Sequence, residues 1–145
     1  MANESPLLID GNLLSGADYR NSTLSGTTHS GKHGSAQFQA VRLSSSTDRT
    51  ILLCTAAGQS VYGILQNKPN SGDAAAVAFM GVTKALAGNT VTPGATLQVD
   101  SSGCLVPYSS ATGINKVGYA LEGATVGQVF TMALYGFGGN VGGNT

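Results

Sequence analysis

The sequence predicts an all-β domain, a small barrel or sandwich of about nine short strands, and three observations predict it. Glycine accounts for 21 of the 145 residues, whereas charged residues make up only 10% of the chain, well below the usual share of about 25%. Short apolar or alternating stretches recur between turn residues such as Gly, Pro, Asn and Asp. One block of sequence also returns in similar form later in the chain, which indicates a duplicated hairpin.

The duplicated blocks span residues 61–81, VYGILQNKPNSGDAAAVAFMG, and residues 116–136, KVGYALEGATVGQVFTMALYG. Laid on each other without a gap, they match three pairs of glycines, namely Gly63 with Gly118, Gly72 with Gly127 and Gly81 with Gly136. Each block reads as two apolar strands around a polar turn. Gly72 and Gly127 therefore occupy equivalent turns, where a positive φ is expected.

The individual strands follow from local patterns along the chain. Strands are expected near residues 37–43, 51–55, 61–66, 74–86, 95–99, 104–108, 117–121 and 128–135, with turns such as SSSTDR, AAGQS, NKPNSGD and DSSG between them. The stretch 74–86, AAAVAFMGVTKAL, has the alanine content of a helix. Gly81 in its middle, three β-branched residues and the alternation after Gly81 favour two strands joined or kinked at that glycine.

Residues 1–36 carry scattered apolar side chains among Asn, Ser, Thr and Gly, without a period of 2 or 3.6. Such a tract does not bury enough apolar area to offset its ordering entropy, so we expect an arm that gains order against a partner. Residues 37–136 form the predicted β domain. Residues 137–145 are a flexible Gly-rich tail in which Phe137 and Val141 are candidate anchors.

Charge and hydropathy exclude several function classes. Seven Lys and Arg balance seven Asp and Glu, which removes the usual electrostatic reason to bind nucleic acid or an anionic membrane. The longest apolar run, residues 74–80, is far shorter than the ~20 residues of a membrane span, and the start MANESPLLIDGN does not resemble a signal peptide. We therefore expect synthesis in a cytoplasm and protein partners, with neither nucleic acid nor membrane among them.

The residues that could carry chemistry predict no enzyme, cofactor or metal site. His29 and His33 have i, i+4 spacing, but the glycines and serines around them disfavour a helix and no third ligand accompanies them. The aspartates fall in turns or in the arm, where turn formation explains them. Cys54 and Cys104 lie in apolar strand-like stretches and are interpreted as small buried hydrophobes, although a disulfide between them stays open.

The chain resembles the small capsid cement, or head decoration, proteins of tailed bacteriophages. The resemblance covers roughly residues 37–136 and rests on YGILQNKP, the following GDAAAVA strand, GVTK, the later PGA with LQVDSSG, and the closing GYALE. It implies a β-rich protomer that forms homotrimers on the outer face of an assembled head and bridges neighbouring major capsid proteins. The arm and the tail have no counterpart in the family pattern.

The leading hypothesis is therefore a structural cement protein of the virion, and the alternative is a small β module of a phage tail or fibre that binds a receptor or glycan. A hydrolase is a third and least favoured hypothesis. Candidate contacts with the capsid or with other subunits are the apolar residues of the arm and tail, namely Leu7, Leu8, Ile9, Leu13, Leu14, Tyr19, Phe137 and Val141. The five tyrosines also suit a partly hydrated interface, because a phenol joins an apolar ring to a polar tip.

Overall fold

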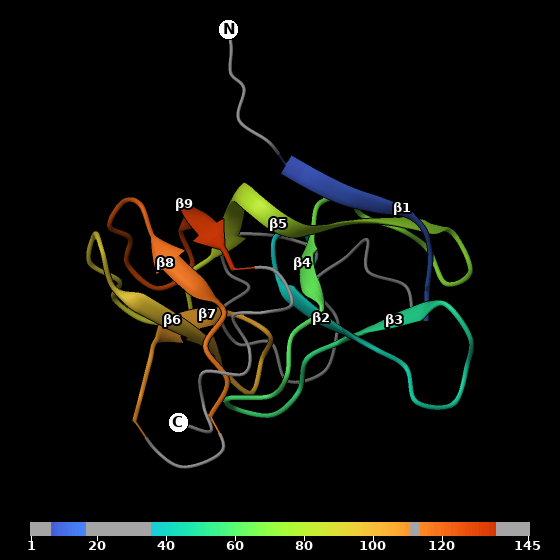
Figure 1. Cartoon of the computed structure of the whole chain (residues 1–145), viewed down its shortest axis with the longest axis horizontal. Helices are drawn as coiled ribbons and strands as arrows, with labels where there is room; N and C mark the ends of the chain where they lie inside the picture. The colour runs from blue at the N-terminus through green and yellow to red at the C-terminus, as the bar shows by residue number, and fades with distance from the viewer. Residues whose placement is uncertain (1–6, 17–35, 111–113, 136–145) are drawn as a thin grey trace, which may run out of the picture.

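The computed structural model describes residues 7–16, 36–110 and 114–135, and this part of the chain contains nine β-strands and no helix (Figure 1). The strands are β1 (Leu7–Ser15), β2 (Ala40–Leu43), β3 (Thr50–Leu53), β4 (Gly63–Leu65), β5 (Ala74–Leu86), β6 (Thr96–Val99), β7 (Leu105–Pro107), β8 (Gly118–Ala120) and β9 (Val129–Leu134). The predicted all-β class is confirmed. A helix with the length and apolarity needed to cross a membrane is not found in the described ranges.

The first ring of strands contains β1, β3, β2, β4 and the first half of β5. β1 runs parallel to β3, where Leu14 lies opposite Thr50, and antiparallel to β5, where Leu8 lies opposite Met80. The antiparallel pairs β3–β2, β2–β4 and β4–β5 complete the circle. Because the ring closes on itself, its strands present few unpaired edges to other chains.

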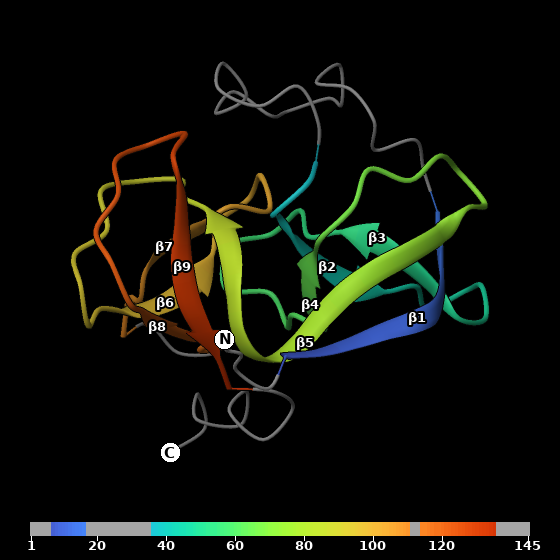
Figure 2. The same ribbon diagram turned by 90° about the horizontal axis from the view of Figure 1, so that it is seen from above.

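The second ring begins where β5 continues past Gly81. There β5 pairs with β9, and the order β9–β8–β6–β7 follows through antiparallel pairs. A parallel bridge between Ala87 and Leu105 closes the ring, supported by a 2.8 Å hydrogen bond that the Gly88 amide donates to the Leu105 carbonyl. β5 therefore belongs to both rings and bends as it passes from one to the other (Figure 2).

The bend in β5 lies at the glycine that the sequence analysis singled out. Gly81 has φ 105°, a conformation that L side chains rarely adopt. Before it the strand pairs with β1 and β4, and after it the strand pairs with β9. The prediction of a kinked strand instead of an alanine-rich helix is confirmed, since residues 74–86 form one strand with a left-handed joint.

The structure corrects the prediction that residues 1–36 form an arm without regular structure. Leu7–Ser15 is strand β1, and it pairs with two strands of its own chain. The physical reason is that β5 and β3 offer an open edge whose amides and carbonyls β1 completes, so short-range periodicity was not needed to order it. The remaining residues of the arm, 17–35, lie outside the described residues, and the division into arm, domain and tail stays a prediction.

The duplication predicted from the sequence is present in the hydrogen bonds of both rings. In the first ring the Asp73 amide donates to Asn70, and the Gln66 amide to Ala76. The counterparts 55 residues later repeat the pattern, because Gln128 donates to Thr125 and Leu121 to Thr131. Gly72 and Gly127 have φ 85° and 82° at the same place in the turn. Their assignment to equivalent turns is confirmed.

The duplication extends beyond the hairpin to whole rings. Ala40 pairs with Ile64 in the first ring as Thr96 pairs with Tyr119 in the second. The β2–β3 pair and the β6–β7 pair match in the same register. β2, β3, β4 and the first half of β5 therefore correspond to β6, β7, β8 and β9. β1 and the second half of β5 are then equivalent, because each is the first strand of its ring along the chain.

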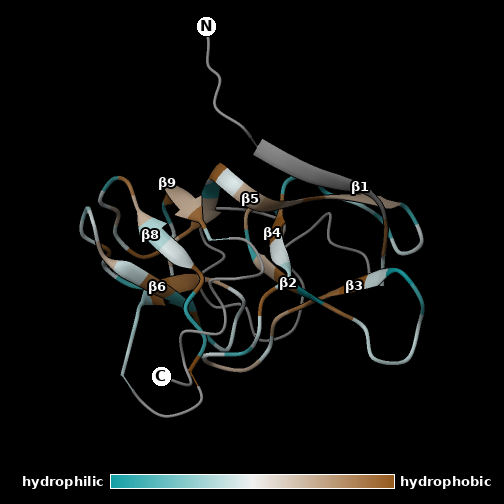
Figure 3. Ribbon diagram, viewed as in Figure 1, coloured by the Kyte–Doolittle hydropathy of each residue, from teal (hydrophilic) through white to brown (hydrophobic). Residues whose placement is uncertain are grey.

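The interior divides into two apolar clusters. The smaller one fills the first ring and contains Leu13, Ala36, Val41, Ile51, Leu65, Ala75 and Val77. The larger one fills the second ring and also takes in residues on the outer face of the first ring, namely Ala40, Cys54, Val61, Ile64 and Ala78. The two rings therefore pack against each other through the larger apolar cluster. Hydrophilic residues gather in the loops at the periphery (Figure 3).

Candidate interaction surfaces

The described residues hold no group of three or more His, Cys, Asp and Glu side chains that could bind a metal ion. The aspartates that the sequence assigned to turns do stabilise turns. Asp100 Oδ1 accepts hydrogen bonds from the amides of Ser102 at 2.8 Å and Cys104 at 2.9 Å. Asp73 Oδ2 accepts one from the Asn70 amide at 3.2 Å. His29 and His33 lie outside the described residues.

The two cysteines are fully buried and form no disulfide, which confirms their interpretation as small core residues. Burial raises the pKa of Cys54 to about 12, partly opposed by the positive charge of Arg42. Burial and the negative charge of Asp100 raise the pKa of Cys104 to about 12, although a hydrogen bond from Gln39 opposes the shift. Neither thiol carries the thiolate character that a nucleophile needs near neutral pH.

The structure places the predicted contact residues of the arm and tail in different environments. The backbones of Leu7, Leu8 and Ile9 lie in β1 opposite Gly81, Met80 and Ala78. Leu13 is buried in the core of the first ring, whereas Leu14 is exposed. Tyr19, Phe137 and Val141 lie outside the described residues. Leu13 packs within its own chain and also lines a surface hollow, and its role as an external contact stays a prediction.

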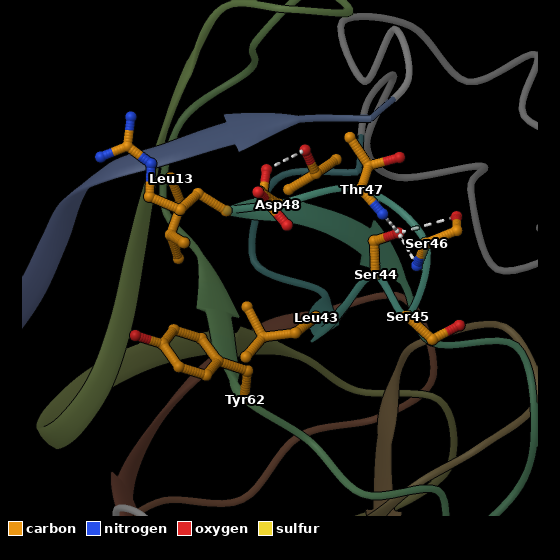
Figure 4. Close-up of a pocket in the computed structure, with 10 residues that line it drawn as sticks. Leu13, Leu43, Ser44, Ser45, Ser46, Thr47, Asp48 and Tyr62 are labelled. Atoms are coloured by element: carbon orange, nitrogen blue, oxygen red, sulfur yellow. Dashed lines mark hydrogen bonds between the residues drawn. The ribbon is translucent and has the colours of Figure 1, made fainter.

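A hollow with a volume of about 400 Å³ lies at one end of the first ring. Its floor contains Leu13, Leu43 and Tyr62, and its rim is the loop of residues 44–49 between β2 and β3 (Figure 4). We call this hollow the mouth of the first ring. Leu43 is 47% exposed, which is unusual for a leucine next to a core.

The rim of the mouth is stabilised by hydrogen bonds between residues that are close in sequence. Ser44 Oγ accepts from the amides of Ser46 at 3.2 Å and Thr47 at 3.1 Å. Thr50 Oγ1 donates to the Asp48 carbonyl at 2.9 Å. Local hydroxyl-to-backbone bonds of this kind fix polar turns. The mouth therefore has an apolar floor and a rim rich in hydroxyl groups.

A second surface lies on the outer side of the second ring and is formed by tyrosines. The rings of Tyr119 and Tyr135 meet edge to face, with centroids 5.1 Å apart and an interplanar angle of 83°. Lys116 Nζ lies 5.1 Å from the ring centre of Tyr108. Burial raises the pKa of Tyr135 to about 12, with hydrogen bonding and electrostatic interaction with Tyr119 adding to the shift. We call these four residues the tyrosine face.

Sequence reasoning found the tyrosines only in general terms and missed the mouth. Tyr119 is 46% exposed, as expected of an interface residue. Leu43 and the loop of residues 44–49 were interpreted as the end of a strand and a turn. The signal that could have found them is the length of this connection, because seven residues separate the paired Leu43 and Ile51, whereas five separate their counterparts Val99 and Leu105. Both surfaces are suited to binding a protein and carry no catalytic arrangement.

The fold and these surfaces define an all-β binding module, and comparison with known proteins gives its family. The family model of phage cement proteins matches residues 22–135 of the chain, which include most of both rings. The chain therefore belongs to the phage cement protein family. The resemblance inferred from the sequence is confirmed, and the protein is a phage structural component associated with the head.

Among solved structures, the chain is similar to the N base of head fiber gp8.5 from bacteriophage phi29. The TM-score is 0.59 at 17% sequence identity, and the match covers 90% of this chain and 94% of that one. At this level of identity the likeness supports the fold. A search of curated protein sequences gives no match.

Proposed function

We propose that the protein binds the outer surface of an assembled phage head as a homotrimer, bridges neighbouring major capsid proteins and thereby stabilises the shell. The observation that carries this proposal is the match of the phage cement family over residues 22–135. A protein that binds the assembled shell better than its separated subunits shifts the equilibrium towards the shell by mass action. No catalytic step is required.

The geometry supports attachment through apolar and phenolic side chains. The described surface exposes Leu14, Leu43 and Tyr119, each at least 40% accessible. At ~25 cal/mol per Å², several hundred Å² of apolar burial contributes several kcal/mol before ordering costs, and three sites on one trimer add avidity. The proposed contacts with the capsid or with other subunits remain Leu7, Leu8, Ile9, Leu13 and Leu14 of β1, together with Tyr19, Phe137 and Val141.

Sedimentation with phage heads tests this function directly. Purified protein is mixed with heads that lack it and centrifuged, and the bound fraction is measured as protein concentration rises. We expect saturable co-sedimentation with a fixed ratio of the protein to the major capsid protein. A tail or fibre module that binds a receptor or glycan would leave the heads bare, and that result would overturn the proposal.

A further inference from the structure

The two rings meet inside the chain through a contact that we call the seam. On one side are apolar residues from the outer face of the first ring, Ala40, Ile64 and Ala78, all without solvent exposure. Across the seam the Ala40 amide donates to the Gly103 carbonyl at 2.7 Å, and the Gly58 amide donates to the Val99 carbonyl at 2.8 Å. The seam is thus a contact between apolar side chains reinforced by backbone hydrogen bonds.

The residues that receive this face are the second ring's equivalents of the mouth. Strand pairing makes Val99 the counterpart of Leu43, since Val99 lies opposite Leu105 as Leu43 lies opposite Ile51. Val99 is fully buried in the seam cluster, whereas Leu43 is 47% exposed. The mouth of the second ring is therefore covered by the first ring, whereas none of the described residues covers the mouth of the first ring.

The outer faces of the two rings also differ in exposure, in the opposite sense to the mouths. The register that pairs Ala40 with Ile64 pairs Thr96 with Tyr119, so Tyr119 is the counterpart of the fully buried Ile64. The same register makes Ala133 the counterpart of Ala78. The outer face of the first ring is covered by the second ring, and the outer face of the second ring, with Tyr119, is exposed.

In the first ring the outer face is covered and the mouth is not, whereas in the second ring the mouth is covered and the outer face is not. We propose that the tyrosine face of one chain docks into the mouth of the first ring of a second copy of this chain, so that the seam is repeated between chains. The occupant of the mouth is inferred from the molecule itself, because the equivalent mouth is already covered by the equivalent face within the chain.

The chemistry of the two uncovered surfaces fits this contact. At the equivalent position the face inside the chain carries Ile64, whereas the exposed face carries the larger Tyr119, with the ring of Tyr135 packed edge to face against it. Larger side chains need a larger recess, and the uncovered mouth has about 400 Å³ of open space. Phenol hydroxyls can exchange hydrogen bonds with the hydroxyl-rich rim, and Lys116 can approach the exposed Asp48 on that rim.

A contact of this kind is head to tail, because it joins two different surfaces. Such contacts form a ring when the rotation closes and a filament when it does not. The inference deepens the homotrimer of the proposed function by assigning its interface, and it relies on that proposal only for the number of copies. A closed trimer would contain six rings of strands joined by three seams within chains and three between chains.

The test uses one charge on each surface of the full-length protein. Leu43→Lys alters the mouth and Tyr119→Glu alters the tyrosine face, while Val126→Lys and Val126→Glu serve as matched controls. Val126 is 49% exposed, lies in the turn before β9 and belongs to neither the mouth nor the tyrosine face. Molar mass is measured by analytical ultracentrifugation over a wide concentration range, and the melting temperature of each variant is recorded.

We expect the wild type and both controls to sediment as oligomers, and each surface variant alone to need at least about tenfold more protein to associate. Mixing Leu43→Lys with Tyr119→Glu should restore part of the association. In a mixed trimer one contact is unaltered, one pairs Lys with Glu and one carries a single substitution, whereas every contact is altered when either variant is alone. Melting temperatures should remain close to that of the wild type, since both side chains are exposed.

Three results would overturn the inference. A wild type that stays monomeric excludes self-association, and an oligomer that Leu43→Lys leaves intact places the contact elsewhere, as in a face-to-face dimer. A variant at Leu43 that melts early but keeps its mass would show that the mouth is covered by the chain's own residues. Sedimentation with heads separates the two proposals, because oligomers that lack head binding would leave this inference standing and contradict the function.

Discussion

The two rings of strands share one plan but differ in what covers them. In the first ring, the strand that opens the ring is β1 from the start of the described chain, and its mouth is uncovered. In the second ring, the opening strand is the continuation of β5, and its mouth is filled by the first ring. Duplication of a closed unit therefore produced unequal copies, because joining them in one chain covers one surface of each and exposes the other.

The largest expected effect comes from removing the opening strand of the first ring. A chain that begins at Gln37 lacks β1 and with it the buried Leu13, whereas a chain that begins at Pro6 keeps both. Loss of a core leucine alone costs about 2–5 kcal/mol, so we expect at least about 4 kcal/mol for the whole strand. A melting temperature lower by about 10 °C or more in thermal unfolding would be the result.

The chain that begins at Pro6 is the control and should melt like the full protein. If the chain that begins at Gln37 also melts like the full protein, β1 is an external attachment instead of a wall of the first ring. That result would restore the interpretation of residues 1–36 as an arm.

A second pair of changes compares two close backbone contacts. A Cβ at Gly63 would overlap the Ala78 carbonyl oxygen, and a Cβ at Gly118 would overlap the Ala133 carbonyl oxygen. These contacts are equivalent in the two rings, and overpacking against backbone has no flexible side chain to relieve it. We expect Gly63→Ala and Gly118→Ala each to lower the free energy of unfolding by about 2–4 kcal/mol in urea titrations.

Equal costs within about 1 kcal/mol would support one plan for both rings. A large cost at one glycine and none at the other would show that the rings are built differently at this point, and the duplication would then be confined to their turns.

A smaller effect is expected in the turns. Gly72 and Gly127 have positive φ, and no atom lies within 4 Å of a Cβ built on Gly72, so backbone strain alone opposes a side chain there. Gly72→Val and Gly127→Val should each cost more than about 1 kcal/mol in chemical denaturation. Ser71→Val is the control, because its counterpart is already a valine, Val126. Unchanged unfolding of both glycine variants would refute the turn assignment.

A further effect concerns the seam and depends on pH. Burial raises the pKa of both Cys54 and Cys104 from 9.0 to about 12. A raised pKa in the folded state means that the thiol contribution to stability is complete below about pH 9 and is lost as the pH rises towards 12. Urea titrations from pH 7 to 11 should show this decline, and the variant with Cys54→Ala and Cys104→Ala should show less of it.

Thiol labelling checks the same point at constant pH. At pH 8 both cysteines should react at least about 1,000-fold more slowly in the folded than in the unfolded protein, because the thiolate is the reactive form and neither thiol is exposed. Rapid labelling of the folded protein would show that the two rings separate readily at the seam.

The local chemistry of the chain made much of the fold predictable. Gly72, Gly81 and Gly127 were assigned to turns or to a kink because glycine adopts positive φ without strain, and all three do so. Alternation and β-branched residues located the strands after residue 36. The duplication followed from the spacing of glycines, since their positions reflect backbone geometry that both copies must keep.

The rest required knowledge of which segments meet in space. β1 could not be predicted, since the open edges of β3 and β5 order it and its own periodicity does not. The mouth could not be predicted either, because Leu43 looks like any strand residue until the structure shows it 47% exposed. The tyrosine face is assembled from β8, the end of β9 and two loops, and the register of the β8–β9 pair, with Tyr119 opposite Ala133, brings Tyr119 and Tyr135 together.

The central claim is that this protein stabilises an assembled phage head, and thermal release of DNA from heads tests it most directly. Heads lacking the protein are heated with increasing amounts of the wild type or of Val126→Glu, and release is followed with a DNA-binding dye. We predict that the release temperature rises with protein concentration and levels off when the heads are saturated. A release temperature that stays constant while the protein is bound to the heads would contradict the claim.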